Sequence, residues 1–284
     1  MNNDRQPRIA AVVVLYHPET EVLANIRSWA NLVDTIFAVD NSEGDCSVVV
    51  STITDLDKVI LIRNRDNVGI ARALNIGSEM ATTGGFDFLL TMDQDSSAAP
   101  DMVAILTECM LTDEANTGLV SPFHVTKSSG MPPRDVSCQK VITPMTSGCL
   151  MNMAAFEVVG PFRDDFFIDF VDNEYCLRLR QAGFSVLRAN KALLQHSVGD
   201  TNKYGPFIAT NHSPLRRYYK TRNRFQVFRE FVFDFPGHCL FDLVRLTKEI
   251  TSIILFEGEK LEKLRMMWRG WRDFRRGKFG KYVG

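Results

Sequence analysis

Four short apolar runs in the first hundred residues each end abruptly on polar side chains. Their length and continuous apolar character are typical of strands that are covered on both faces. Segments with helical spacing, residues 19–33 and 70–83, follow the first and the third run. This order of strand, helix, strand, strand, helix, strand predicts an α/β fold with a mainly parallel sheet flanked by helices. The runs are residues 9–16 (IAAVVVLY), 34–42 (DTIFAVDNS), 58–69 (KVILIRNRDNVG) and 86–95 (FDFLLTMDQD).

The polar ends of these runs predict where a ligand binds. Ligands of open parallel sheets lie outside the carboxyl ends of the strands. A polar tip at every predicted strand therefore indicates a binding edge. The tips are Tyr16-His17, Asp40-Asn41, Asn64 to Asn67, and Asp93 to Asp95.

The overall composition excludes few classes of protein. A chain of 284 residues with 45% hydrophobic residues can bury a sizeable core, as one large domain or as one domain with an appendage. Its 33 Lys and Arg against 34 Asp and Glu give no reason to expect nucleic acid as a partner. The charge is uneven, however, because nine Lys and Arg stand against three acids from Glu259 to the end.

Cysteine usage and hydropathy indicate a cytoplasmic protein. The six cysteines are scattered and form no CxxC pair, which fits neither a zinc site nor a small disulfide framework and favours a reducing compartment. The first apolar run is only as long as a strand and lacks a preceding basic segment, so we expect a first strand rather than a signal peptide. No stretch reaches the roughly 18 apolar residues of a membrane span.

Two aspartates one residue apart follow the fourth apolar run. Asp93 and Asp95 could together chelate a hard divalent cation, whose charge would neutralise a departing diphosphate. Alternatively, they belong to a solvated turn or to a helix start, which Ser96, Ser97 and Pro100 also suggest.

Small residues alternate with others where a polar loop enters the second predicted helix. Small side chains let the backbone approach a ligand, and a helix start offers N–H groups to phosphate, which Arg72 could also bind. The alternative is that the same residues pack the helix against the sheet. They are Asn67, Gly69, Ala71, Ala73, Asn75 and Gly77.

Later segments carry three further groups of candidates. Asp169, Asp172 and Glu174 crowd the start of a predicted helix, where they could favour the helix dipole or raise one another's pKa toward that of a general base. His196 follows another short apolar run, and a lone histidine is more often structural than a ligand. A basic aromatic helix over 216–225 (RRYYKTRNRF) is a solvated face, a partner surface or a phosphate-binding element.

The order of these pieces resembles that of a family 2 glycosyltransferase, most closely its bacterial rhamnosyltransferase branch. The resemblance covers about residues 8–225. The segments FIDFVDNEYCLR and RRYYKTRN favour the rhamnosyltransferase branch. The pieces, in order, are AVVVLYHPE, VDNS, NVGIARALNIG, LLTMDQDS, TSGCLMN, FFIDFVDNEYCLRLRQAGF, QHSVGD and RRYYKTRNRF.

The resemblance implies a GT-A nucleotide-diphospho-sugar transferase fold with a C-terminal helical extension. The catalytic core would span residues 1–205, with a donor half to about 97 and an acceptor half over 98–205, and a basic helical region would span 206–284. The implied reaction moves L-rhamnose from dTDP-L-rhamnose to a hydroxyl of a glycan or lipid-linked acceptor, with inversion and with Mg²⁺ or Mn²⁺. Other donors, UDP- or GDP-linked, remain an alternative.

The resemblance also implies the donor contacts. Asp40 matches the acid that contacts the nucleoside, and Tyr16 and Asn67 lie in nucleotide-contacting stretches. Arg72 lies near them, and Arg222 lies in a motif that closes over the donor.

Metal and catalytic roles follow in the same way. Asp93 and Asp95 match the metal-binding DxD motif, in which Asp93 also contacts the donor, and His196 matches a histidine near the diphosphate and metal. Asp172 matches the base that deprotonates the acceptor. Val171 stands where many relatives carry an acid, so Asp169 or Glu174 could share the role of Asp172.

Two roles are possible for the C-terminal region, and two other functions are possible for the whole chain. Its apolar and basic helices could contact the inner face of the plasma membrane or form a homo-oligomer. A sugar-nucleotide pyrophosphorylase would carry a Gly-rich loop with arginine after the first strand, where this chain has YHPET. A non-catalytic relative would have lost the DxD motif or Asp172, and both are present.

Overall fold

The computed structural model describes residues 5–44, 48–112, 116–126, 130, 132–133, 137–196, 202–204 and 207–284. The chain forms two compact units. The N-terminal unit comprises Met1–Phe162 and Tyr175–Ser197, and the C-terminal unit comprises Arg163–Glu174 and Val198–Gly284. Residues 163–174 thus belong with the C-terminal helices, and the predicted boundary between donor and acceptor halves near residue 97 stays a prediction.

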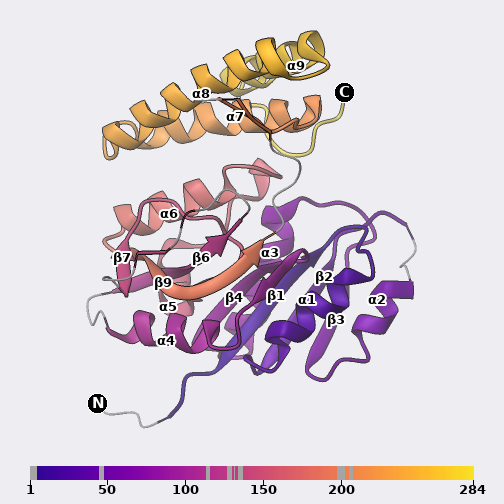
Figure 1. Cartoon of the computed structure of the whole chain (residues 1–284), viewed down its shortest axis with the longest axis vertical. Coiled ribbons are helices and arrows are strands. Elements are labelled where there is room, and N and C mark those ends of the chain that lie inside the picture. Colours follow the sequence, from indigo (N-terminus) through magenta and orange to yellow (C-terminus); the bar gives the residue numbers. More distant parts are fainter. Residues whose placement is uncertain are drawn as a thin grey trace. The chain divides into compact units, whose positions relative to one another are not determined.

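The N-terminal unit is built on one sheet, in which the described residues contribute nine strands (Figure 1). The strand order is β3-β2-β1-β4-β8-β6-β9-β5, with β7 paired to β9. The neighbours β3, β2, β1 and β4 are parallel, as predicted, whereas β8 runs antiparallel to both β4 and β6, so the complete sheet is mixed. The strands are β1 (Ile9–Leu15), β2 (Thr35–Asp40), β3 (Val59–Arg63), β4 (Phe88–Asp93), β5 (Ser96–Ala98), β6 (Thr117–Val125), β7 (Cys138–Lys140), β8 (Cys149–Asn152) and β9 (Ser185–His196).

Helices cover both faces of this sheet, which explains the continuous apolar runs of its central strands. Every residue of β1 is buried. The side chains of Ala11 and Val13 belong to a core with α1 and α4, while Val12 faces α3 on the opposite side. The helices of this unit are α1 (Glu21–Ala30), α2 (Val48–Ile53), α3 (Ile70–Thr83), α4 (Met102–Thr112) and α5 (Met153–Val159), and α6 (Val171–Gln181) begins in the C-terminal unit and continues into this one.

The contact between α3 and β1 is close because Gly77 has no side chain. A Cβ atom at this position would lie 2.3 Å from Cγ2 of Val12. Ala71 and Ala73 of the same helix are also completely buried. Packing of α3 against the sheet therefore accounts for Ala71, Ala73 and Gly77 in the small-residue pattern.

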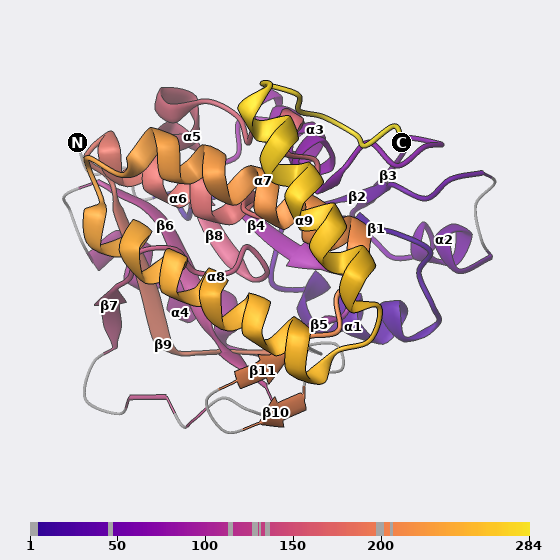
Figure 2. The same cartoon turned by 90° about the horizontal axis from the view of Figure 1, so that it is seen from above.

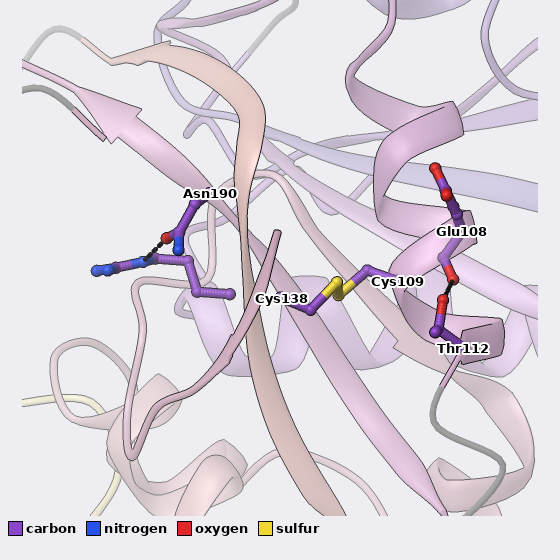
Figure 3. The surroundings of a disulfide bond; sticks show 6 residues. Glu108, Cys109, Thr112, Cys138 and Asn190 are labelled. Atoms are coloured by element: carbon purple, nitrogen blue, oxygen red, sulfur yellow. Dashed lines mark hydrogen bonds between the residues drawn. A yellow bond between two sulfur atoms is a disulfide. The ribbon is translucent and has the colours of Figure 1, made fainter. Parts of the chain in front are cut away.

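A disulfide bond joins α4 to the short strand β7 (Figure 3). It links Cys109 to Cys138, which lie 29 positions apart in the sequence. The expectation of reduced cysteines is wrong for this pair. Their spacing follows no recognisable pattern, and the pair forms because β7 adds to β9, on which α4 packs.

The C-terminal unit consists mainly of three helices, of which α9 packs across α7 and α8 runs beside it (Figures 1 and 2). Ser213 caps α7 by accepting the N–H of Arg216 at 3.3 Å, and Pro214 occupies the first helical position, where a missing N–H costs nothing. Among the described residues, no helix has the length and apolar content to cross a membrane. The elements are η1 (Asp164–Phe166), β10 (Asn202–Tyr204), β11 (Phe207–Ala209), α7 (Pro214–Phe231), α8 (Pro236–Phe256) and α9 (Lys260–Arg275).

Buried ion pairs hold α7 to α8. Arg224 pairs with Asp242 and with Glu249, both at 2.9 Å. Arg217 pairs with Glu249 and, at 2.7 Å, with the completely buried Glu257. Burial alone would raise the pKa of Glu249, but the charges of Lys220, Arg224 and Arg217 lower it to about 2. The carboxylate is therefore ionised near neutral pH and neutralises the arginines beside it.

Substitution Gly77→Ala tests the contact between α3 and β1. The added methyl overlaps Val12, so the helix must move away from the sheet, and we expect a loss of about 1–3 kcal/mol in the free energy of unfolding. Urea unfolding followed by circular dichroism measures the loss. The matched control is Gly130→Ala in the same unit, where no atom lies within 4 Å of the new Cβ. Equal midpoints for the two variants would contradict the close contact.

Candidate functional site

The carboxyl ends of β1 to β4 lie at one edge of the sheet. Leu15 at the end of β1 is paired with Asp40 of β2, which is paired with Arg63 of β3. On the other side of β1, Val14 is paired with Asp93 of β4. The parallel register therefore brings the predicted polar tips together, and we name this region the strand-end site.

The DxD motif forms the turn between β4 and β5. Asp93 is half-buried and Asp95 is exposed. Gln94 between them turns toward the end of β1: its Oε1 accepts the Tyr16 N–H at 2.8 Å, and its Nε2 donates to the Tyr16 carbonyl at 3.1 Å. Because α4 begins only at Met102, after β5, the two aspartates do not cap a helix.

Ser147 supports the same turn from the segment before β8. Its hydroxyl accepts the backbone N–H of Asp93 at 3.2 Å and lies 2.8 Å from the hydroxyl of Ser96. The carbonyl of Ser147 in turn lies 2.8 Å from Nε2 of His124. Sequence reasoning missed Ser147 and His124, and no local pattern marks them, because they reach the turn from other parts of the chain.

Asparagine side chains tie the loop before α3 to the end of β2. Asn41 accepts hydrogen bonds at 3.1 Å from the Val68 N–H and from the side chain of Asn64, and it donates to Oδ1 of Asn67 at 3.1 Å. The same Oδ1 accepts the N–H of Gly69 at 3.0 Å, and the φ of Gly69 is 89°, a conformation that favours glycine. Asn67 thus shapes the start of α3, in addition to its predicted nucleotide contact.

Asp40 and Tyr16 differ in how far their side chains are exposed at this edge. Asp40 is buried, and its Oδ1 accepts the N–H of Ser42 at 3.1 Å. Tyr16 is 44% exposed, so its ring can be covered by a ligand. The guanidinium of Arg72 forms an ion pair at 2.8 Å with Glu79 of the same helix. A donor contact by Arg72 would require that pair to open.

The strand-end site offers two hard oxygen donors for a cation. Among the described residues, no three or more His, Cys, Asp or Glu side chains cluster closely enough to hold a metal ion. The side chain of the predicted ligand His196 lies outside the described part of the chain. Two carboxylates at an open edge suit Mg²⁺ or Mn²⁺, which take waters and phosphate oxygens as their other ligands.

A second group of candidates lies in the C-terminal unit, in the loop that leads to α6. Three residues of this loop have positive φ angles without being glycine: Phe167 (65°), Asp169 (64°) and Phe170 (65°). Such conformations are uncommon and cost of order 1–3 kcal/mol each when strained. Surrounding contacts must therefore hold the loop in this shape.

Arg222 and Asn223 of α7 supply those contacts. The side-chain amide of Asn223, which is completely buried, donates to the carbonyls of Phe166, Ile168 and Asp169, each at 2.9 Å. Nη2 of Arg222 donates to the carbonyls of Asp165 and Phe166, both at 3.0 Å. Burial lowers the pKa of Arg222, and its Nη1 donates to the carbonyl of Gly280 at 2.8 Å. Its predicted role over the donor stays a prediction, and its contacts here are to this chain's own carbonyls.

Asp172 lies in the first turn of α6, directly after this loop. It is half-buried, and its Oδ1 accepts the N–H of Asn173 at 2.8 Å. Of the other two acids, Asp169 pairs with Arg216 at 3.2 Å and Glu174 is buried. Because Asp93 and Asp172 belong to different units, their convergence on one substrate stays a prediction.

Known structures share this fold. S. aureus TarS (residues 1–349), solved with UDP-GlcNAc, matches with a TM-score of 0.64 and 13% identity over 95% of this chain and 81% of that chain. GalNAc-T7, solved with UDP, GalNAc and Mn²⁺, matches with a TM-score of 0.60 and 12% identity over 78% of this chain, which spans only 48% of that structure. These matches show that the chain has the GT-A fold.

Comparison with known sequences identifies the family of the chain. The family model of glycosyl transferase family 2 matches residues 11–139. The dTDP-rhamnosyl transferase RfbF of Shigella flexneri is 30% identical over 242 residues, and the match covers 78% of this chain and 80% of RfbF. The chain belongs to glycosyl transferase family 2 and is of the bacterial rhamnosyltransferase type.

Substitution Asn223→Asp tests whether the buried amide holds the strained loop. The side chain keeps its size but loses the two N–H donors and places an oxygen against three carbonyls. At about 1 kcal/mol for each lost hydrogen bond, we expect a loss of about 3 kcal/mol in the free energy of unfolding. Urea unfolding followed by tryptophan fluorescence measures it.

The matched control is Asn211→Asp. Asn211 is exposed in the same unit, so this substitution makes the same chemical change outside the loop. We expect its unfolding midpoint to stay close to that of the unchanged protein. If both variants unfold at the same urea concentration, Asn223 does not hold the loop.

Proposed function

We propose that this glycosyltransferase moves L-rhamnose from dTDP-L-rhamnose to a hydroxyl of a glycan or lipid-linked acceptor, with inversion at the anomeric carbon. The reaction would serve the synthesis of a bacterial cell-surface polysaccharide on the cytoplasmic side of the membrane. The observation that carries the proposal is the strand-end site, at which parallel pairing brings Asp40 and Asp93 to one edge, with Asp95 in the turn that follows Asp93. The similarity to the dTDP-rhamnosyl transferase RfbF supports the choice of donor.

Residues at the ends of β1 and β2 would bind the nucleotide. Asp40, whose Oδ1 accepts the Ser42 N–H, would accept a hydrogen bond from the nucleoside. Tyr16 is exposed beside it, and Asn67 lies in the loop that hydrogen bonds tie to Asn41. Arg72 and Arg222 are further predicted donor contacts, and each would have to leave an existing interaction.

Asp93 and Asp95 would hold a divalent cation, with His196 as a further predicted ligand. The turn that carries the two aspartates is fixed by Gln94 and Ser147, so the carboxylates need little reorganisation to bind. When bound, Mg²⁺ or Mn²⁺ supplies positive charge that stabilises the leaving diphosphate.

Asp172 would act as the general base that takes the proton of the acceptor hydroxyl. The attack of that oxygen opposite the departing dTDP forms the new glycosidic bond and inverts the anomeric carbon, through an oxocarbenium-like transition state. The strained loop held by Arg222 and Asn223 leads directly into the helix turn of Asp172. This support favours Asp172 over Asp169, whose carboxylate is occupied by Arg216.

A transferase with another donor sugar is the competing proposal. It is favoured by the solved structures of the same fold, which contain UDP, GalNAc and UDP-GlcNAc. Those structures are 12–13% identical to this chain and so bear on the fold alone.

Substitution Asp172→Asn tests the base. The amide cannot take a proton, so we expect the rate of rhamnose transfer to fall by about 10²–10⁴-fold while the affinity for dTDP stays unchanged. Product formation from dTDP-L-rhamnose and calorimetry with dTDP measure the two effects. Glu157→Gln, the same chemical change at an exposed position of α5, is the control. Transfer at the unchanged rate in Asp172→Asn would refute the assignment.

Calorimetry tests the donor and the metal together. We expect dTDP to bind about tenfold more tightly than UDP or GDP in Mn²⁺, because UDP lacks the methyl group of thymine and carries an extra hydroxyl, and GDP carries a purine in place of thymine. Chelation with EDTA should weaken binding, and Asp95→Asn should reduce the affinity in Mn²⁺ to the value in EDTA. Asp101→Asn, exposed before α4, is the control. Equal affinities with and without metal would contradict the roles of Asp93 and Asp95, and preference for UDP or GDP would favour the competing donor.

A further inference from the structure

The outer face of α8 carries apolar side chains that nothing in the described part of the chain covers. Leu240 is 64% exposed and Phe241 is 56% exposed. Val244, Ile254 and Leu255 lie on the same side of the helix by their spacing, whereas Cys239 and Ile253 on the opposite side are buried. Exposed apolar side chains therefore lie near both ends of this 21-residue helix, and the polar residues Thr247, Lys248 and Thr251 lie between them on the same face.

The outer face of α9 adds aromatic rings to this surface. Leu261, Trp268 and Trp271 are exposed, and the two indole rings lie 6.4 Å apart. Figure 2 shows α9 crossing over α7, with α8 running beside them in the C-terminal unit. We call the exposed residues of α8 and α9 the outer helical face.

In this region, most acidic side chains point into the unit, whereas nearly all lysines and arginines lie at its surface. Of the six acids after Pro236, four are turned inward, where they bind groups of α7 and α9. Only one of the eleven lysines and arginines, Lys263, is buried. The inward acids are Asp242, Glu249, Glu257 and Asp273, which interact with Arg224, Arg217, Lys263 and Tyr218.

Several of the remaining cations lie directly on the exposed rings. The guanidinium of Arg245 is 4.5 Å from the ring of Phe241. Those of Arg272 and Arg275 are 5.5 Å and 5.9 Å from the rings of Trp268 and Trp271. On each of the two helices, exposed apolar and cationic groups thus lie side by side, where a bilayer can receive the rings and stems and anionic headgroups can pair with the cations.

We propose that the outer helical face binds the surface of an anionic membrane. Charge complementarity favours this partner over a second copy of the chain. A two-fold interface would place the same face on itself and bring like-charged arginines together, at a cost that an anionic surface does not impose. Since none of the described helices can span a bilayer, the contact is with the surface.

The inference does not depend on the proposed sugar transfer, because it concerns groups outside the strand-end site and the loop before Asp172. Membrane binding can be measured without donor or acceptor. A failure to bind membranes and a failure to transfer rhamnose are therefore separate outcomes.

Sedimentation with vesicles tests the proposal on the complete chain. Vesicles of phosphatidylcholine alone are compared with vesicles that also contain phosphatidylglycerol. We expect binding to the anionic vesicles that weakens as NaCl is added. Each cation near the surface contributes about fivefold to partitioning, so Arg265→Glu, Arg272→Glu and Arg275→Glu together should weaken it by more than about 100-fold.

Two further variants keep the test decisive. Phe241→Ser with Leu255→Ser removes apolar contact and should also weaken binding by more than about tenfold. The matched control reverses three exposed cations of the N-terminal unit, Arg27→Glu, Lys140→Glu and Lys191→Glu, and should bind as the unchanged chain does. Circular dichroism confirms that each variant is folded.

Three results would overturn the proposal. One is the absence of binding to anionic vesicles, and a second is equal binding to neutral and anionic vesicles. The third is equal loss of binding in the outer-face and control charge variants. If light scattering instead shows a dimer that Phe241→Ser with Leu255→Ser converts to monomer, without vesicle binding, the face is an interface between copies of this chain.

Discussion

Parallel pairing of β1 to β4 is the constraint on which the strand-end site depends. Each strand must run in the same direction for its carboxyl end to reach the same edge, and the register then sets Asp40 beside the end of β1 and Asp93 on its other side. Cover on both faces of the sheet makes this arrangement stable, because α1 and α4 pack on one face and α3 on the other. The polar tips follow directly after the apolar, covered part of each strand.

Much of this half of the fold could be predicted from local patterns. Continuous apolar runs identify strands buried on both faces, and their polar ends identify the binding edge. The interactions that fix the site could not be predicted in this way. Gln94 binds the backbone of Tyr16, and Ser147 binds that of Asp93, across 78 and 54 positions of the sequence. The disulfide between Cys109 and Cys138 was missed for the same reason, since its partners meet only through β9.

The arginine-rich helix α7 shows where composition misleads. Its sequence favours a solvated face, a partner surface or a phosphate-binding element, yet Arg217, Arg222 and Arg224 are buried. Acids of α8 and backbone carbonyls of the loop before α6 neutralise or bind them, so the helix organises its own unit. Spacing along α7 cannot reveal this, because the partners come from distant segments. The basic surface is formed instead by α9, whose cations lie on exposed tryptophans.

The central claim is that the edge formed by β1 to β4 holds the diphosphate of a nucleotide sugar. A crystal structure of the chain grown with dTDP and Mn²⁺, with anomalous data for manganese, tests it most directly. The account predicts one anomalous peak within bonding distance of Asp93 or Asp95, with the diphosphate beside it and the nucleoside against Asp40. Nucleotide and manganese bound elsewhere, with Asp40, Asp93 and Asp95 facing solvent, would contradict it.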